Sequence, residues 1–145
     1  MPCDFEIIMP MGGLGSRFRQ KGYSQPKPLI PILGQPLFLK ALSSLNEILP
    51  QSRISFVVCK EDVIKAEIEK CLATKKFSYQ IIELEKRTQG PAETLFQCQN
   101  SINQTLPLLS LDCDLFFSSP SYIKKIKEKE HNLLCYFEAT DPRYS

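Results

Sequence analysis

Short apolar segments rich in β-branched and aromatic residues alternate along this chain with longer segments in which apolar residues recur at helical spacing. Residues 53–59 (RISFVVC), for example, are followed by Ile64, Ile68 and Leu72 at helical intervals. This alternation predicts a parallel α/β sheet with helices on both faces. We expect strands at residues 5–10, 53–59, 79–84, 106–111 and 132–138, and helices at residues 37–49, 61–74, 92–102 and 120–129.

Residues 20–36 interrupt the alternation because they are rich in proline and glycine, and we expect an ordered irregular crossing there rather than a helix. No internal repeat, low-complexity tract or linker divides the chain, so residues 1–145 are predicted to form a single domain. The final residues, TDPRYS, form a polar turn with no closing helix or edge strand after it. We therefore expect this domain to be truncated.

Charge and cysteine content argue against several classes of protein. The 18 basic and 16 acidic residues are mixed along the chain and leave a net charge of +2, so no nucleic-acid partner is predicted. The six cysteines form no CxxC pair, and with one histidine they do not match a zinc site; we expect reduced, buried thiols and a structural His131. Without a signal sequence or a long apolar run, we expect a cytoplasmic protein with no membrane partner.

Three glycines, Gly12, Gly13 and Gly15, directly follow the first predicted strand. Glycines at such a position allow positive φ and bring backbone N–H groups close to phosphate oxygens. Arg17 adds a cation suited to bridging those oxygens. The loop lacks the Gly-Lys-Ser/Thr ending of a P-loop, and Phe18 replaces the third glycine of the dinucleotide fingerprint. A tight turn that binds nothing is the alternative interpretation.

A lysine between two prolines follows the glycine loop. Pro26 and Pro28 restrict the backbone around Lys27, so its ammonium is presented from a stiff support. A solvated loop lysine is the alternative, but the spacing of Lys27 from the glycine loop favours a functional residue.

The segment MPMGGLGSRFRQKGYSQPKPLIPILGQPL resembles the N-terminal signature of the sugar-1-phosphate nucleotidyltransferases and related cytidylyltransferases, within the MobA-like NTP transferase superfamily. The resemblance covers essentially the whole chain in order of elements and is strongest over residues 7–38. It implies a Rossmann-like three-layer α/β/α fold with a mostly parallel sheet. It also implies that Arg17 and Lys27 are catalytic residues that contact the phosphates of a nucleoside triphosphate, which is wrapped by Gly12, Gly13, Leu14, Gly15, Ser16 and Arg17. Gly12 stands where alanine is more usual in the family.

A second motif, TQGPAET at residues 88–94, lies between a predicted strand and a predicted helix, where Pro91 suits the first helical turn. By itself it is an ordinary strand-to-helix turn. The resemblance implies that Gln89, Gly90 and Ala92 lie against the nucleobase, whose identity stays open. Pro91 and Glu93 are less typical of the family.

Two aspartates, Asp112 and Asp114, follow an apolar predicted strand. The carboxyl ends of parallel strands are where open α/β sheets bind ligands. A helix cap and a turn former are the alternative interpretation. Beside a triphosphate, carboxylates at this edge suit Mg²⁺, which takes one or two protein oxygens in addition to phosphates. Asp114 matches the metal-binding aspartate of the resembling family, and Asp112 is the secondary candidate.

The resemblance implies a nucleotidyltransferase that transfers a nucleoside monophosphate from a triphosphate to a sugar-1-phosphate and releases pyrophosphate. Its expected partners are the nucleoside triphosphate and a phosphorylated small molecule, with Mg²⁺ as cofactor. The acceptor-binding portion is expected beyond Ser145. Two alternatives stay open: a cytidylyltransferase acting on a non-sugar phosphate used in surface polysaccharide decoration, and a non-catalytic nucleotide-binding fragment. The oligomeric state is not predicted.

Overall fold

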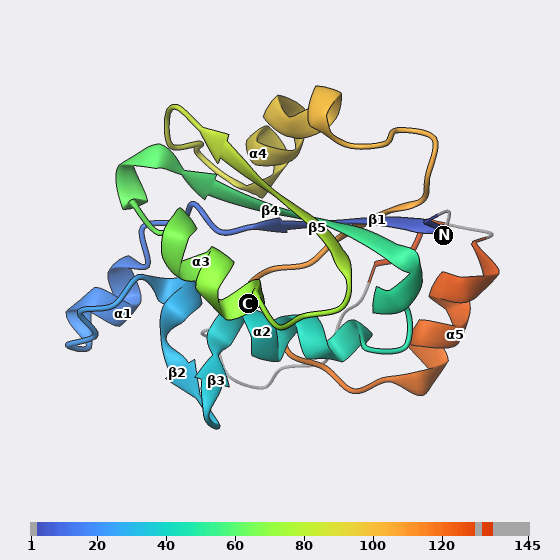
Figure 1. Ribbon diagram of the computed structural model, residues 1–145, viewed down its shortest axis with the longest axis horizontal. Helices are drawn as coiled ribbons and strands as arrows, with labels where there is room; N and C mark the ends of the chain where they lie inside the picture. Colours follow the sequence, from blue (N-terminus) through green and yellow to red (C-terminus); the bar gives the residue numbers. More distant parts are fainter. Residues whose placement is uncertain (1–2, 130–131, 135–145) are drawn as a thin grey trace.

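The computed structural model describes residues 3–129 and 132–134. Four parallel strands form a sheet in the order β5-β4-β1-β6 (Figure 1). They are β1 (Phe5–Pro10), β4 (Ser52–Cys59), β5 (Ser78–Leu84) and β6 (Leu108–Ser110). In the registers of the central strand, Ile7 pairs with Ile54 of β4 and with Leu109 of β6. The predicted parallel sheet is confirmed for these four strands.

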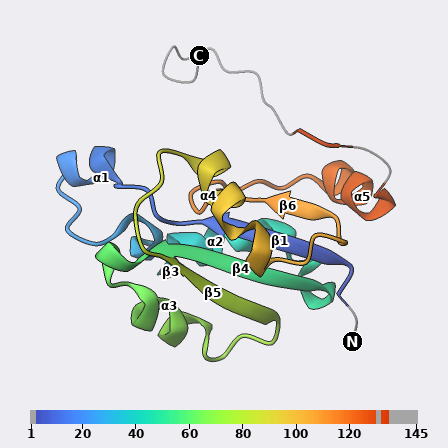
Figure 2. The same cartoon turned by 90° about the horizontal axis from the view of Figure 1, so that it is seen from above.

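Helices cover both faces of the sheet, which gives the expected three-layer α/β/α arrangement. One face carries α2 (Leu37–Leu42), α3 (Lys65–Leu72) and α5 (Pro120–Glu128), and the other carries α4 (Pro91–Cys98), as Figures 1 and 2 show. Side chains of β1 alternate between the two faces. Ile7 joins the larger core against the three helices, and Ile8 joins the smaller core against α4.

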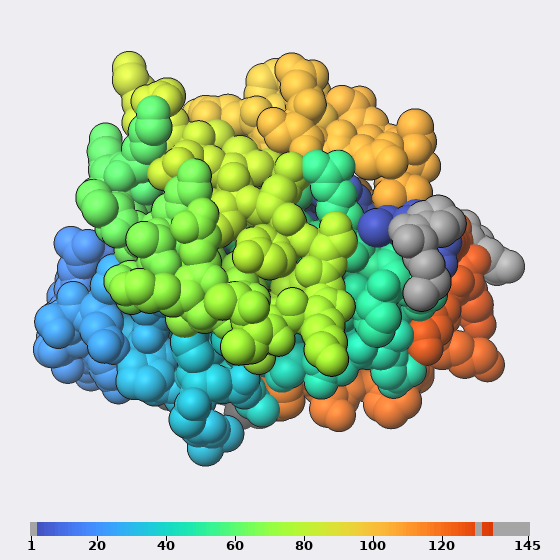
Figure 3. Space-filling view, viewed as in Figure 1, coloured from blue at the N-terminus to red at the C-terminus, as the bar shows by residue number. Residues whose placement is uncertain are grey.

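The connection from β1 to α2 contains more structure than the irregular crossing expected from its prolines and glycines. It includes the short helix α1 (Ser16–Gln20), which was not predicted, and a 3₁₀ turn (Lys27–Leu29). It then forms a two-stranded hairpin of β2 (Pro31–Ile32) and β3 (Gln35–Pro36), which projects at the lower edge of Figure 3 in light blue. Leu33 and Gly34 at its tip both have positive φ, 49° and 79°, as a two-residue hairpin of the primed type requires.

The predicted helices are shorter than their apolar patterns suggested. The helix expected at 37–49 ends at Leu42 and continues as the 3₁₀ turn Ser43–Leu45, where the Ser43 hydroxyl donates to the Lys40 carbonyl. The helix expected at 61–74 begins only at Lys65, after a 3₁₀ turn, and the one expected at 92–102 ends at Cys98. Apolar spacing continues through 3₁₀ turns, so it does not mark the end of an α-helix.

The last predicted strand, 132–138, is not confirmed. Residues 132–134 lie outside any strand, and the rest of that segment, like His131, falls outside the described residues. The β6 strand is also shorter than expected, because Pro107 has no N–H to donate to the sheet.

The cysteines of the described ranges are unpaired. Cys59, Cys98 and Cys113 are buried, whereas Cys3 and Cys71 are partly exposed, so the prediction of buried thiols is correct for three of the five. Within the same ranges, no helix is both long and apolar enough to cross a bilayer.

Candidate functional site

A cavity of about 470 Å³ opens at the carboxyl ends of the parallel strands. Three segments far apart in the sequence line it: residues 10–14 at the end of β1 and beyond it, residues 87–91 with Thr94 between β5 and the first turn of α4, and residues 112–114 after β6. Lys27 completes the lining from the connection between β1 and α2. The parallel topology thus brings together the glycine loop, the TQG motif (residues 88–90) and the two aspartates at the sheet edge where α/β proteins bind ligands.

The glycine loop is held from both ends. Met11 N–H donates to the Val57 carbonyl at 2.8 Å, which extends the β1–β4 contact into the loop. Gly15 has φ 60°, and a Cβ on this residue would lie 3.1 Å from the Cβ of Lys27. Gly15 is therefore required where the loop passes Lys27. At Gly12 an added Cβ would meet Cys59 at an ordinary 3.8 Å, so the alanine more usual in the resembling family would also fit.

Lys27 and Asp114 form an ion pair in the cavity. The Lys27 Nζ and Asp114 Oδ2 atoms lie 2.7 Å apart, with 25% and 39% of the respective side chains exposed. The Lys27 ammonium also lies 5.8 Å from the centre of the Phe18 ring. The structure therefore places the predicted phosphate-binding lysine beside the predicted metal-binding aspartate.

The two aspartates flank a buried cysteine. Asp112 and Asp114 are exposed and line the cavity, whereas Cys113 is buried. Burial raises the pKa of the Cys113 thiol to about 11, so this thiol stays protonated at neutral pH.

The residues of this edge suit a metal that needs few protein ligands. Across residues 3–129 and 132–134, no group of three or more His, Cys, Asp or Glu side chains is arranged to hold a metal ion. Two carboxylates that line this cavity fit Mg²⁺, whose remaining ligands are phosphate oxygens and water. They do not fit a structural zinc site, which takes four protein ligands.

The connection from β5 to α4 is ordered by its own side chains. Gln89 N–H donates to Glu93 at 2.7 Å, and the hydroxyls of Thr88 and Thr94 are 2.6 Å apart. The Thr94 hydroxyl also bonds the Gly90 carbonyl at 3.1 Å. Because Glu93 and Thr94 lie in the first turn of α4, the start of this helix fixes the loop that faces the cavity.

The lining includes only part of the predicted site. Gly12, Gly13, Leu14, Lys27, Gln89, Gly90, Asp112 and Asp114 line the cavity. The cavity lining does not include Gly15, Ser16, Arg17 or Ala92. Arg17 is exposed on α1, so its contact with phosphate remains a prediction.

Arg87 lines the cavity and was not expected from the sequence. Its Nη1 donates to the Gly12 carbonyl, and its Nη2 pairs with Asp62 Oδ1 at 2.5 Å. The hydrogen bond that Arg87 donates to the Asp62 carboxylate is the main reason why the pKa of Arg87 lies above its ordinary value. The available signal was its position, because Arg87 follows the carboxyl end of β5 and directly precedes the TQG motif.

The sequence matches the MobA-like NTP transferase domain over residues 7–142. The chain belongs to this family. This family match and the solved structures that share the fold confirm the predicted Rossmann-like α/β fold. No curated protein sequence matches the chain.

Several solved structures share the fold of this NTP transferase domain. A nucleoside-diphosphate-sugar pyrophosphorylase from Vibrio cholerae RC9 is 26% identical, with a TM-score of 0.64 over 80% of this chain and 51% of the other. A putative glucose-1-phosphate thymidylyltransferase from Bacillus anthracis is 20% identical, with a TM-score of 0.70 over 87% and 51%. An inositol-1-phosphate CTP transferase from T. maritima is 22% identical, with a TM-score of 0.59 over 72% and 41%. The chain thus spans about half the length of these structures or less.

Proposed function

We propose that this chain is the nucleotide-binding part of a nucleotidyltransferase that joins a nucleoside monophosphate to a sugar-1-phosphate. The main support is that the glycine loop, the Lys27–Asp114 ion pair and the TQG loop line the same cavity. Membership of the NTP transferase family supports the reaction class. The cavity offers exposed backbone beside a cation and carboxylates, which is the chemistry that a metal-bound triphosphate needs.

The proposed reaction is a displacement at the α-phosphorus. An oxygen of the sugar phosphate forms a bond to the α-phosphorus while the bond from this phosphorus to the bridging β-phosphate oxygen breaks, and pyrophosphate leaves. A phosphate monoester is anionic at neutral pH, so its attack needs no dedicated general base. The work of the protein is positioning and charge neutralisation.

Specific residues are assigned to that work. Backbone N–H groups of the glycine loop orient the triphosphate, and Lys27 offsets the charge that gathers on the leaving pyrophosphate. Asp114, with Asp112, would hold Mg²⁺, which when bound neutralises phosphate charge. Gln89 and Gly90 are assigned to the nucleobase. Arg17 reaches a phosphate only if the triphosphate extends past Leu14 toward α1.

A second candidate is a cytidylyltransferase acting on a phosphate of a non-sugar alcohol. This candidate is suggested by an inositol-1-phosphate CTP transferase that shares the fold at 22% identity. The chemistry at the α-phosphorus is the same in both candidates, so only the acceptor and the base distinguish them.

Pyrophosphate release tests the proposal. The chain is incubated with Mg²⁺, one of CTP, UTP, dTTP, ATP or GTP, and a pool of sugar-1-phosphates and other phosphomonoesters, with Mg²⁺ omitted as the control. Metal-dependent release with one pair identifies the substrates, and a non-sugar acceptor selects the second candidate. Binding of a triphosphate without release fits both a nucleotide-binding part and a non-catalytic module, and release by a longer form of the protein distinguishes the two. Failure to bind any of the five triphosphates contradicts the proposal.

A further inference from the structure

Arg87 joins the glycine loop to two other connections of the sheet edge. One nitrogen of its guanidinium donates to the carbonyl of Gly12, which lies 75 residues earlier in the chain. The other pairs with Asp62, which follows β4. Arg87 itself follows β5, so a single side chain connects the chain segments that leave three neighbouring strands.

This contact is largely shielded from solvent. The exposed fractions of the Arg87 and Asp62 side chains are 21% and 13%. Arg87 contacts Asp62 through both terminal nitrogens, at 2.5 and 3.3 Å, and this forked geometry fixes the plane of the guanidinium. A fixed plane also fixes the direction of the hydrogen bond to Gly12.

Backbone strain lies next to Asp62. Val63 has φ 50°, a left-handed conformation that is a genuine outlier for a β-branched residue. Its side chain is 84% exposed, so burial of Val63 does not compensate for the strain. Such strain persists where surrounding contacts over-determine the backbone, and it concentrates at functional sites. The strained residue directly follows Asp62, the partner of Arg87.

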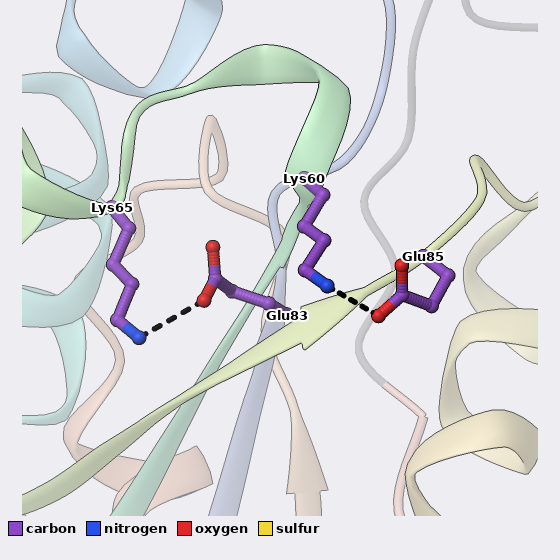
Figure 4. Close-up of polar contacts among 4 residues, drawn as sticks. All are labelled: Lys60, Lys65, Glu83 and Glu85. Atoms are coloured by element: carbon purple, nitrogen blue, oxygen red, sulfur yellow. Dashed lines mark hydrogen bonds and ion pairs between the residues drawn. The ribbon is translucent and has the colours of Figure 1, made fainter.

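Two other ion pairs also link the segment after β4 to the end of β5, but they do not contact the glycine loop. Lys60 pairs with Glu85 at 2.5 Å and Lys65 pairs with Glu83 at 2.9 Å, both near the end of β5 (Figure 4). Both pairs lie at the surface, where ion pairs contribute little stability. They provide matched controls, because they link the regions around α3 and β5 without touching Gly12.

We infer that Arg87, oriented by Asp62, is a positioning residue that holds the glycine loop in the conformation that receives the triphosphate. Lys27 and Arg87 are the cationic side chains among the described residues that line the cavity. Lys27 is assigned to the phosphates, whereas Arg87 acts on the loop backbone. The role of the loop conformation in nucleotide binding rests on the proposed function, but the contact between Arg87 and Gly12 does not.

The test combines hydrogen exchange of the intact chain with nucleotide affinity. The variants are Arg87→Ala, Arg87→Lys and Asp62→Asn, with Lys60→Gln as the matched control. Amide exchange of Met11, whose N–H donates to Val57 where the glycine loop begins, is followed in the absence of nucleotide, and exchange of β1 serves as the internal measure of global opening. Dissociation constants are then measured for the five magnesium nucleoside triphosphates.

Arg87→Ala is expected to speed exchange of the Met11 amide by about tenfold or more while exchange of β1 stays unchanged, because a charge-assisted hydrogen bond to the neighbouring Gly12 carbonyl is lost. Triphosphate affinity is expected to fall by a similar factor. Arg87→Lys and Asp62→Asn change both quantities in the same direction by less, and Lys60→Gln changes neither. If Arg87→Ala does not fold, the exchange and affinity of Arg87→Lys and Asp62→Asn decide whether the inference holds.

Exchange of the Met11 amide within about twofold of the parent in the Arg87 and Asp62 variants overturns the inference. An equal change in Lys60→Gln also overturns it. Unchanged affinity in a variant whose loop exchanges faster would refute the role in nucleotide binding. If the parent chain binds no triphosphate, the proposed function fails separately, and loop exchange alone decides whether Arg87 orders the loop.

Discussion

Lys27 is the side chain on which the proposed chemistry depends most directly. Its ammonium lies 2.7 Å from Asp114, and its Cβ faces Gly15. The backbone around Lys27 is held by prolines on both sides, and Pro28 is buried. The lysine is therefore supported by the fold at its backbone while its charged end stays in the cavity.

Replacement of Lys27 by alanine should lower turnover far more than stability. We expect turnover to fall about 100-fold or more, because charge on the leaving pyrophosphate loses its partner. The free energy of unfolding should fall by no more than about 1 kcal/mol, because a partly exposed ion pair is screened by solvent. Pyrophosphate release and urea unfolding measure the two effects. Lys65→Ala, which removes an ion pair outside the cavity, is the control, and parallel loss of turnover and stability in Lys27→Ala would contradict the assignment.

Gly15→Ala should destabilise the chain where Gly13→Ala does not. Gly15 has positive φ and little space beside Lys27, whereas an added Cβ on Gly13 would meet no atom within 4 Å. We expect a loss of about 1–2 kcal/mol in the free energy of unfolding for Gly15→Ala and less than about 0.5 kcal/mol for Gly13→Ala. Urea unfolding of both variants checks this. Equal values would mean that the backbone at Gly15 is not strained by a side chain.

At the scale of elements, the start of α4 organises the loop that precedes it. Thr94 is buried in the first turn of this helix and bonds both Thr88 and Gly90. The Glu93 carboxylate, in the same turn, accepts a hydrogen bond from the Gln89 N–H. The position of the TQG loop therefore depends on how α4 packs through Leu95 and Cys98 against the sheet.

Thr94→Val should loosen this loop without changing the shape of the buried side chain. The substitution leaves the Thr88 hydroxyl without this partner, so we expect faster amide exchange at residues 88–90 and a loss of about 1–2 kcal/mol in the free energy of unfolding. Thr94→Ser is the control, because it keeps the hydroxyl and loses a methyl group. The serine variant should lose about 1 kcal/mol but retain slow exchange. Fast exchange in both variants would assign the effect to packing.

At the scale of the whole molecule, the larger core ties the sheet to its helices. Phe56 of β4 lies at its centre, with its ring edge-to-face against Phe38 of α2 at 5.6 Å and against Tyr79 of β5 at 6.3 Å between centroids. Phe38 and Phe56 are fully buried, whereas Tyr79 is partly exposed. Aromatic pairs of this geometry add stability beyond the area that they bury.

Phe56→Ala should destabilise the whole fold rather than one element. We expect the free energy of unfolding to fall by about 3–5 kcal/mol, since the substitution leaves a cavity between sheet and helix. Tyr79→Leu, at the edge of the same cluster, should cost less than about 1.5 kcal/mol. Urea unfolding followed by circular dichroism measures both. A cost for Phe56→Ala no larger than that for Tyr79→Leu would show that the core does not depend on this ring.

Local apolar patterns were sufficient to predict the four strands of the sheet and its carboxyl edge, but not α1, the β2–β3 hairpin or the ends of the helices. The apolar run at residues 5–10 is the central strand, and Asp112 and Asp114 lie at the carboxyl edge because they follow a strand. The side-chain period of each segment is a local property, so it survives in any context that buries one face. The glycine loop and Lys27 were likewise identified from their own neighbourhood in the sequence.

Contacts between distant segments were decided only by the tertiary structure. The strand order β5-β4-β1-β6, the approach of Gly15 to Lys27 and the bond from Arg87 to Gly12 each depend on which strands become neighbours. Pairing between strands is set by the packing of the whole core, and no spacing along the chain records it. Arg87 was therefore not predicted from the sequence, because only the assembled sheet brings it beside the glycine loop.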